Sequence, residues 1–200
     1  MNCSVIVAHP TPSSFNHALA RAAAAVLRQH GYEIHWHDLY AEQFVPLLET
    51  EEIPKEAPLH PSLRRQCEEI VQADGIVIVH PNWWSQPPAI LKGWLDRVLR
   101  PGMAYTFATN DQGEGQAVGL LRAQAALVIN TANTPQEKEV SLLGDPLDLI
   151  WRKCVFGLCG VENFHRLVFS PVIISSAAQR QQWLHEVEIV VDRIFRPEKR

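Results

Sequence analysis

The chain has 200 residues, 46% of them apolar, and a formal charge of −4. This length and apolar content suit a single domain over residues 1–200. The weakly acidic balance provides no basic footprint, so neither nucleic acid nor membrane insertion is expected. The first expected strand starts at Cys3, which leaves no room for a signal peptide, and the apolar run Ala22–Val26 is too short to span a bilayer. We therefore expect a cytoplasmic protein.

Cysteine and histidine spacing does not indicate a metal site. The four cysteines form no C-x-x-C pair, so reduced thiols are expected, with Cys154 and Cys159 facing a core. His35 and His37 lie two residues apart on an expected edge strand, and no third ligand accompanies them. We expect their side chains to be exposed and assign them no function.

Apolar patterns predict strands and helices that alternate along the chain. The expected strands are Cys3–Ala8, Tyr32–His37, Ile76–Val79, Ala125–Asn130 and Phe164–Phe169. The expected helices are Ser14–Gln29, Ser62–Gln72, one from Pro88, one around Pro146–Leu158, and Ala177–Phe195. Residues 38–61 are rich in proline and should form an irregular surface connection, with a solvated charge cluster at Glu49, Glu51 and Glu52. This order predicts an α/β three-layer sandwich with a flavodoxin-like, five-stranded parallel sheet in the order 2-1-3-4-5.

In such a sheet, ligands bind at the carboxyl ends of the first and third strands. The loop after the first strand, His9–Asn16, carries Thr11, Ser13 and Ser14 at the start of a helix, where free N–H groups favour an anion such as phosphate. It matches neither a Walker A loop nor G-x-G-x-x-G. Simple N-capping by Ser13 or Ser14 is the alternative, and His9 either makes a structural hydrogen bond or contacts a phosphate.

The loop after the third strand contains two adjacent tryptophans, Trp83 and Trp84. Such a pair is costly to expose and suits a flat aromatic cofactor, while packing over a core is the alternative. The loop after the fourth strand, Asn130–Pro135, is small and polar, and either borders the same crevice or forms a plain turn. Three such loops at one edge of the sheet favour a flat-ring site.

These residues resemble the flavodoxin-like NAD(P)H:quinone oxidoreductase family, also called DT-diaphorase, with its bacterial relatives. The resemblance covers about Cys3 to Gly160. The matching motifs, in family order, are Ala8-His9, Ser14-Phe15-Asn16, Asp38-Leu39-Tyr40 with Phe44 and Pro46, Pro81, Trp84, Pro88-Ala-Ile-Leu-Lys-Gly-Trp94, Ala104-Tyr-Thr106, Gly144-Asp145 and Cys159-Gly160.

The resemblance implies a flavin, FAD with FMN as the alternative, and NAD(P)H as the hydride donor. A quinone-like acceptor would then be reduced by two-electron ping-pong transfer. The phosphate and ribityl side would be held by His9, Ser13, Ser14, Phe15 and Asn16, and the ring would be bordered by Pro81, Asn82, Trp83, Trp84, Ser85, Thr131, Asn133 and Thr134. Backbone N–H groups of Trp83 to Ser85 are the candidates for the N5/O4 side of the ring, and the Thr131 loop for the N1/O2 side.

The resemblance also implies a homodimer whose active sites lie at the subunit interface. Trp84, Tyr105 and Phe107 would contact substrate, the last two in the partner's pocket, and Trp94 would lie close to the subunit contact.

The chain departs from the animal enzymes at the catalytic acid. Those enzymes have a Tyr in the loop after the fourth strand and a His before the Gly-Asp pair, but here that segment has no Tyr and Leu143 precedes Gly144. Their Thr-Thr-Gly-Gly is replaced by Thr131-Ala132-Asn133-Thr134, which alters the contacts to the flavin pyrimidine. No catalytic residue is assigned, and water or a group from the partner subunit is expected to supply the proton.

Two other functions fit the same motifs. One is a flavin-binding ancillary or regulatory subunit of a membrane potassium-efflux system or another partner protein. The other is a one-electron flavodoxin carrier, which the modest charge disfavours because such carriers need a strongly acidic face.

Overall fold

A parallel sheet forms the centre of the computed structural model, which describes residues 1–109, 113 and 115–197. Its strand order is β2-β1-β3-β6-β7, and all neighbouring strands are parallel. The strands are β1 Asn2–Val7, β2 Glu33–Asp38, β3 Gly75–Pro81, β6 Ala125–Thr131 and β7 Phe164–Phe169. This confirms the predicted order 2-1-3-4-5, because the labels β4 and β5 belong to a separate hairpin.

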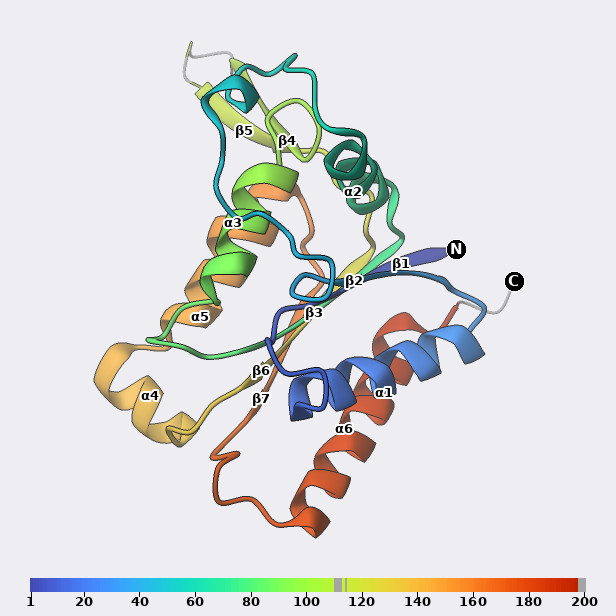
Figure 1. Ribbon diagram of the computed structural model, residues 1–200, viewed down its shortest axis with the longest axis vertical. Helices are drawn as coiled ribbons and strands as arrows, with labels where there is room; N and C mark the ends of the chain where they lie inside the picture. Colours follow the sequence, from blue (N-terminus) through green and yellow to red (C-terminus); the bar gives the residue numbers. More distant parts are fainter. Residues whose placement is uncertain (110–112, 114, 198–200) are drawn as a thin grey trace.

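Helices cover both faces of the sheet (Figure 1). One face packs against α1 Phe15–Gln29 and α6 Ala177–Phe195, and the other against α2 Pro61–Gln72, α3 Ala89–Val98 and α5 Pro146–Leu149. Because both faces are covered, β3 and β6 are buried along their whole length, with Val77 and Val79 facing the first layer and Ile76 and Ile78 the second. None of the described helices is both long and apolar enough to cross a membrane.

Two elements were not predicted from the sequence, and a third differs in form from its prediction. A two-stranded antiparallel hairpin, β4 Tyr105–Thr109 with β5 Gly115–Gly119, lies beyond the end of α3, and its strands are largely exposed. Helix α4, Gln136–Leu143, is short and carries exposed leucines, so its apolar pattern is weak. The single helix expected around Pro146–Leu158 is instead α5 followed by a π-helical segment, Ile150–Gly157.

The segment between β2 and α2 is irregular, as expected, apart from a 3-10 turn at Thr50–Glu52. The expectation that Glu52 is solvated is wrong, because its side chain is buried. The Arg97 guanidinium on α3 donates through Nε to Glu52 Oε2 at 2.8 Å and through a second nitrogen to Oε1. This ion pair attaches the irregular segment to α3.

Two further expectations about burial are corrected, for the histidines of β2 and for Cys154. His35 is half-buried and His37 is only 4% exposed. The His37 ring lies against the Glu69 carboxylate, with 2.9 Å between Nε2 and Oε2. Cys154 is exposed on the π-helical segment, whereas Cys159 is buried as expected. Trp94 is buried in the core of its own chain, where its indole N–H donates to Gln66 Oε1 at 2.7 Å.

Candidate functional site

A cavity of about 590 Å³ opens at the carboxyl ends of β1, β3 and β6. Its volume is typical of a small-molecule site. It brings together most of the predicted cofactor residues: His9, Phe15, Asn16, Pro81, Asn82, Trp83, Trp84, Ser85, Thr131, Asn133 and Thr134. Ser13 and Ser14 precede α1 and do not line it. The lining residues not predicted from the sequence are Ala132, Lys138, Glu139, Leu142, Leu143 and Val172.

The first loop presents the amino end of α1 to the cavity. Ser14 is the N-cap residue, and its Oγ accepts from the backbone N–H of His17 at 3.4 Å, so the capping interpretation holds for Ser14. The N–H groups of Phe15 and Asn16 donate no hydrogen bond within the part of the chain that the structure describes. These two donors, with the helix dipole, remain available to an anion.

His9 combines a structural hydrogen bond with a place in the cavity wall. Its Nδ1 accepts from the Thr11 backbone N–H at 3.1 Å, which puts the proton of the neutral ring on Nε2. Burial lowers the pKa of His9 below its usual value, so the ring is neutral at neutral pH. The Trp83 ring packs against it, with 6.3 Å between ring centroids. His9 can therefore offer one uncharged donor to a ligand.

The two tryptophans belong to a tight turn. Trp83 and Gln86 exchange both backbone hydrogen bonds, at 3.1 and 3.0 Å, around Trp84 and Ser85, which have φ angles of 58° and 57°. Two left-handed central residues define a type I′ turn, which favours Asn-Gly and is strained for tryptophan. Trp84 is 97% exposed, so the core-packing alternative is wrong for it.

The turn also changes which backbone donors can meet a ligand. The Trp83 N–H is already bonded to Gln86, which removes it from the predicted set. The N–H groups of Trp84 and Ser85 have no acceptor among the described residues. An exposed indole and two free backbone donors thus occupy consecutive positions on the cavity wall.

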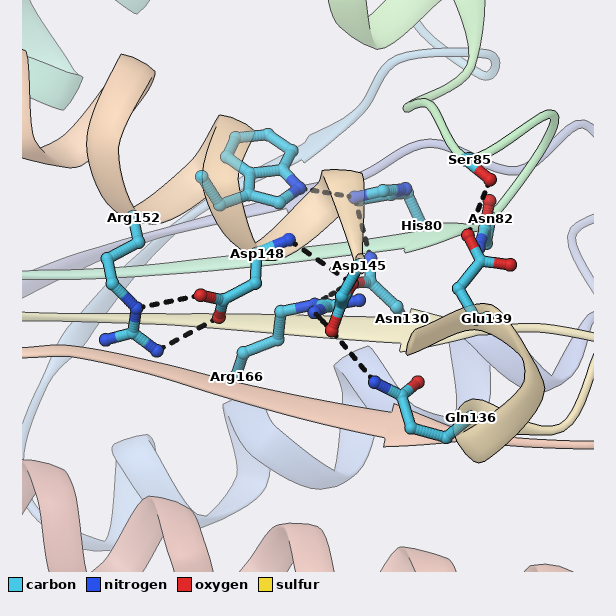
Figure 2. A network of polar contacts seen from close by, with 11 residues as sticks. His80, Asn82, Ser85, Asn130, Gln136, Glu139, Asp145, Asp148, Arg152 and Arg166 are labelled. Atoms are coloured by element: carbon cyan, nitrogen blue, oxygen red, sulfur yellow. Dashed lines mark hydrogen bonds and ion pairs between the residues drawn. The ribbon is translucent and has the colours of Figure 1, made fainter. Parts of the chain in front are cut away.

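Helix α4 adds a carboxylate that the sequence analysis missed. Glu139 Oε1 accepts from Ser85 Oγ at 2.5 Å and from Asn82 Nδ2 at 3.2 Å (Figure 2). Glu139 is only 7% exposed and lines the cavity. The missed signal was Pro135 followed by two glutamates, which is typical of a helix start.

A buried histidine near the end of β3 joins this strand to β6 and to the π-helical segment. His80 donates through Nδ1 to the Pro81 carbonyl at 2.8 Å, and its Nε2 accepts from Asn130 at 2.7 Å and from the Trp151 indole at 3.0 Å. Two donors on Nε2 require the neutral ring. Burial lowers the pKa of His80 to about 4, in agreement with that arrangement.

The same network continues to the start of α5. Asn130 Oδ1 accepts from Arg166 Nε at 2.6 Å, and Arg166 pairs with Asp145 at 2.7 Å (Figure 2). Asp145 caps α5 and also accepts from Gln136 on α4 at 2.9 Å. This network therefore connects β3, β6 and β7 by hydrogen bonds to α4 and α5.

The predicted substrate residues Tyr105 and Phe107 lie outside this cavity. Both are on β4, with their rings in edge-to-face contact at 5.7 Å between centroids. Phe107 is exposed, and Tyr105 lines a second, apolar cavity of about 400 Å³ between α3 and the π-helical segment. Their contact with a partner's pocket stays a prediction.

The chain resembles known proteins over nearly its whole length. A family model described as flavodoxin-like fold matches residues 1–189. An uncharacterized NAD(P)H oxidoreductase from Haemophilus influenzae is 32% identical over 197 residues, 91% of this chain and 95% of that protein. NAD(P)H dehydrogenase (quinone) 1 from Rattus norvegicus is 35% identical over 124 residues, 52% of this chain but only 45% of the rat protein.

Solved structures agree with these matches. A putative quinone reductase from Klebsiella pneumoniae superimposes with a TM-score of 0.86 at 24% identity, over 99% of this chain and 86% of that chain, which shows the likeness of fold. Taken with the strand order and the position of the cavity, these matches show that the chain belongs to the flavodoxin-like fold family, among the relatives of the NAD(P)H:quinone oxidoreductases.

Proposed function

We propose that the protein is a flavin-dependent NAD(P)H oxidoreductase that reduces quinones or related acceptors by two-electron ping-pong transfer. The observation that carries this proposal is the Trp83–Gln86 turn, which holds an exposed indole and two free N–H groups in the wall of the cavity. The names of the Haemophilus influenzae and rat relatives support the NAD(P)H donor, and the rat name supports the quinone acceptor.

The residues of the cavity fit a flavin. The free N–H groups of Phe15 and Asn16 suit its phosphate, and Trp84 offers a flat apolar surface to its ring. Asn82 Oδ1 is a buried acceptor without a partner among the described residues, and a ring N–H would satisfy it. FAD is proposed from the family resemblance, with FMN as the alternative. The bound flavin would accept a hydride from the nicotinamide and deliver it to the acceptor.

We extend the proposal to a homodimer whose active sites lie at the interface. Subunit interfaces cover apolar surface. Such surface is found at the apolar cavity between α3 and the π-helical segment, and at the exposed side chains of Leu142, Leu143 and Leu149 nearby in the sequence. Within one chain, Tyr105 and Phe107 do not line the proposed flavin cavity. In the proposed dimer, these two residues of each subunit would contact substrate in the pocket of the other subunit.

The purified protein should carry a flavin with visible absorbance, or bind FAD or FMN at micromolar concentration. Heat release followed by chromatography identifies which flavin is bound. In anaerobic stopped-flow experiments, NADH or NADPH should bleach that absorbance and a quinone should restore it in a separate step. A protein that binds neither flavin contradicts the proposal.

Trp84→Ala should weaken flavin binding about two- to twelvefold, the equivalent of roughly 0.5–1.5 kcal/mol for an aromatic contact. The melting temperature should stay unchanged, because Trp84 is almost fully exposed. Leu47→Ala removes another exposed apolar side chain, one that does not line the cavity, and serves as the control. Flavin affinity unchanged from the wild type in Trp84→Ala would contradict a contact between this side chain and the flavin.

A further inference from the structure

Glu139 places a carboxylate in the wall of the proposed flavin cavity. Among the described lining residues it is the acidic one, and it is largely excluded from water, whereas the neighbouring Lys138 is exposed. Both hydrogen-bond partners, Ser85 Oγ and Asn82 Nδ2, donate to the same carboxylate oxygen. The other oxygen has no partner within the described part of the chain, and Figure 2 shows it directed away from both donors.

A poorly hydrated charge acts strongly on another charge in the same cavity. At an effective dielectric constant of about 20, two unit charges about 10 Å apart repel enough to change an equilibrium constant about tenfold. Reduction by hydride adds negative charge to a flavin ring. A carboxylate in the wall therefore opposes reduction, whereas an exposed charge at the same distance is screened by water and salt.

We propose that Glu139 tunes the bound flavin by lowering its midpoint potential, and that the hydrogen bonds from Ser85 and Asn82 hold the carboxylate in place. This inference rests on the proposed function, since it needs a flavin in the cavity. It assigns a role to a side chain on α4, in a segment that has no Tyr and in which Leu143, not His, precedes Gly144.

Glu139→Gln separates the charge from the hydrogen bonds, because the amide oxygen can accept from the same two donors. The affinity for oxidised flavin should therefore stay within about threefold of the wild type. The affinity for reduced flavin should rise about tenfold relative to oxidised flavin, which raises the midpoint potential by about 30 mV for a two-electron couple. Redox titration against a reference dye measures this shift without turnover.

Glu137→Gln is the matched control. It removes the same charge from the same helix, but Glu137 is exposed and does not line the cavity. Its midpoint potential should move by less than about a third of the Glu139→Gln shift, because solvent screens the charge.

A charge swap provides the second test. In the double variant N82D/E139Q, the carboxylate moves to the neighbouring wall position, where the glutamine amide can donate to it. The midpoint potential should return toward that of the wild type. The double variant has the same net charge as the wild type and keeps a carboxylate in the cavity wall. If Glu139 only supported the fold, this variant would not recover the wild-type midpoint potential.

The inference is wrong if Glu139→Gln shifts the midpoint potential no more than Glu137→Gln does, or if the swap leaves the potential at the Glu139→Gln value. Failure of the wild-type protein to bind FAD or FMN would instead contradict the proposed function. The two failures are thus distinguished by the flavin affinity of the unmodified protein.

Discussion

Replacing Glu52 with alanine should lower the free energy of unfolding by about 3–5 kcal/mol. The change leaves the Arg97 guanidinium buried without its carboxylate, and an unpaired buried charge is far more costly than a lost surface pair. The loss extends beyond one ion pair. Arg97 also donates to the Val45 carbonyl, and Arg100 donates to the carbonyls of Glu52 and Pro54. The whole irregular segment before α2 should loosen.

Urea denaturation measures the effect, and Glu51→Ala provides the control, because Glu51 is the exposed neighbour in the same turn. Its substitution should change stability by no more than about 0.5 kcal/mol. The hydrogen bond from Arg97 holds the pKa of Glu52 below its usual value. The pair therefore stabilises the fold above the ordinary glutamate pKa and loses this contribution as the pH falls through the folded-state pKa. Equal stability of the two variants would contradict the assignment.

Acidification from neutral pH to about pH 4 should remove about 3 kcal/mol of stability through His80 alone. The folded-state pKa of His80 is about 4, because the ring is buried. In the unfolded chain the ring titrates near 6.5, so the unfolded state binds the proton first. The contribution is fully present above the unfolded-state pKa, and it declines as the pH falls until the folded state is also protonated.

Chemical denaturation across this pH range tests the claim. His80→Gln should be less stable at neutral pH, since it disturbs the bonds to Asn130 and Trp151, but its stability should fall less steeply with acid. His185→Gln is the matched control, because His185 is exposed on α6 and its loss should leave the wild-type slope unchanged. An unchanged slope in His80→Gln would show that another group dominates acid unfolding.

The parallel sheet was predictable because strands covered on both faces leave continuous apolar runs, such as Ile76–Val79. The three loops of the cavity followed from the strand order, since carboxyl ends of parallel strands meet at one edge. The contacts that complete the site depend on residues far apart in sequence. Ser85 meets Glu139 and His80 meets Asn130 only because the folded sheet brings them together, and local patterns carry no trace of that pairing.

Burial of charge was missed for the same reason. Glu52 looks like a surface residue between other glutamates, and only Arg97, 45 positions along the chain, makes its burial tolerable. Helix α4 escaped prediction because it is short and its leucines are exposed, and Glu139 was missed with it.

The left-handed pair at Trp84 and Ser85 limits how this protein can be improved by selection for stability. Glycine at either position would relieve the backbone and favour the folded chain. The same change would delete the indole from the cavity wall or the hydroxyl that meets Glu139. Screens that reward thermal resistance alone should therefore drift toward Asn-Gly here and lose ligand affinity, so stabilising libraries should leave these two positions fixed.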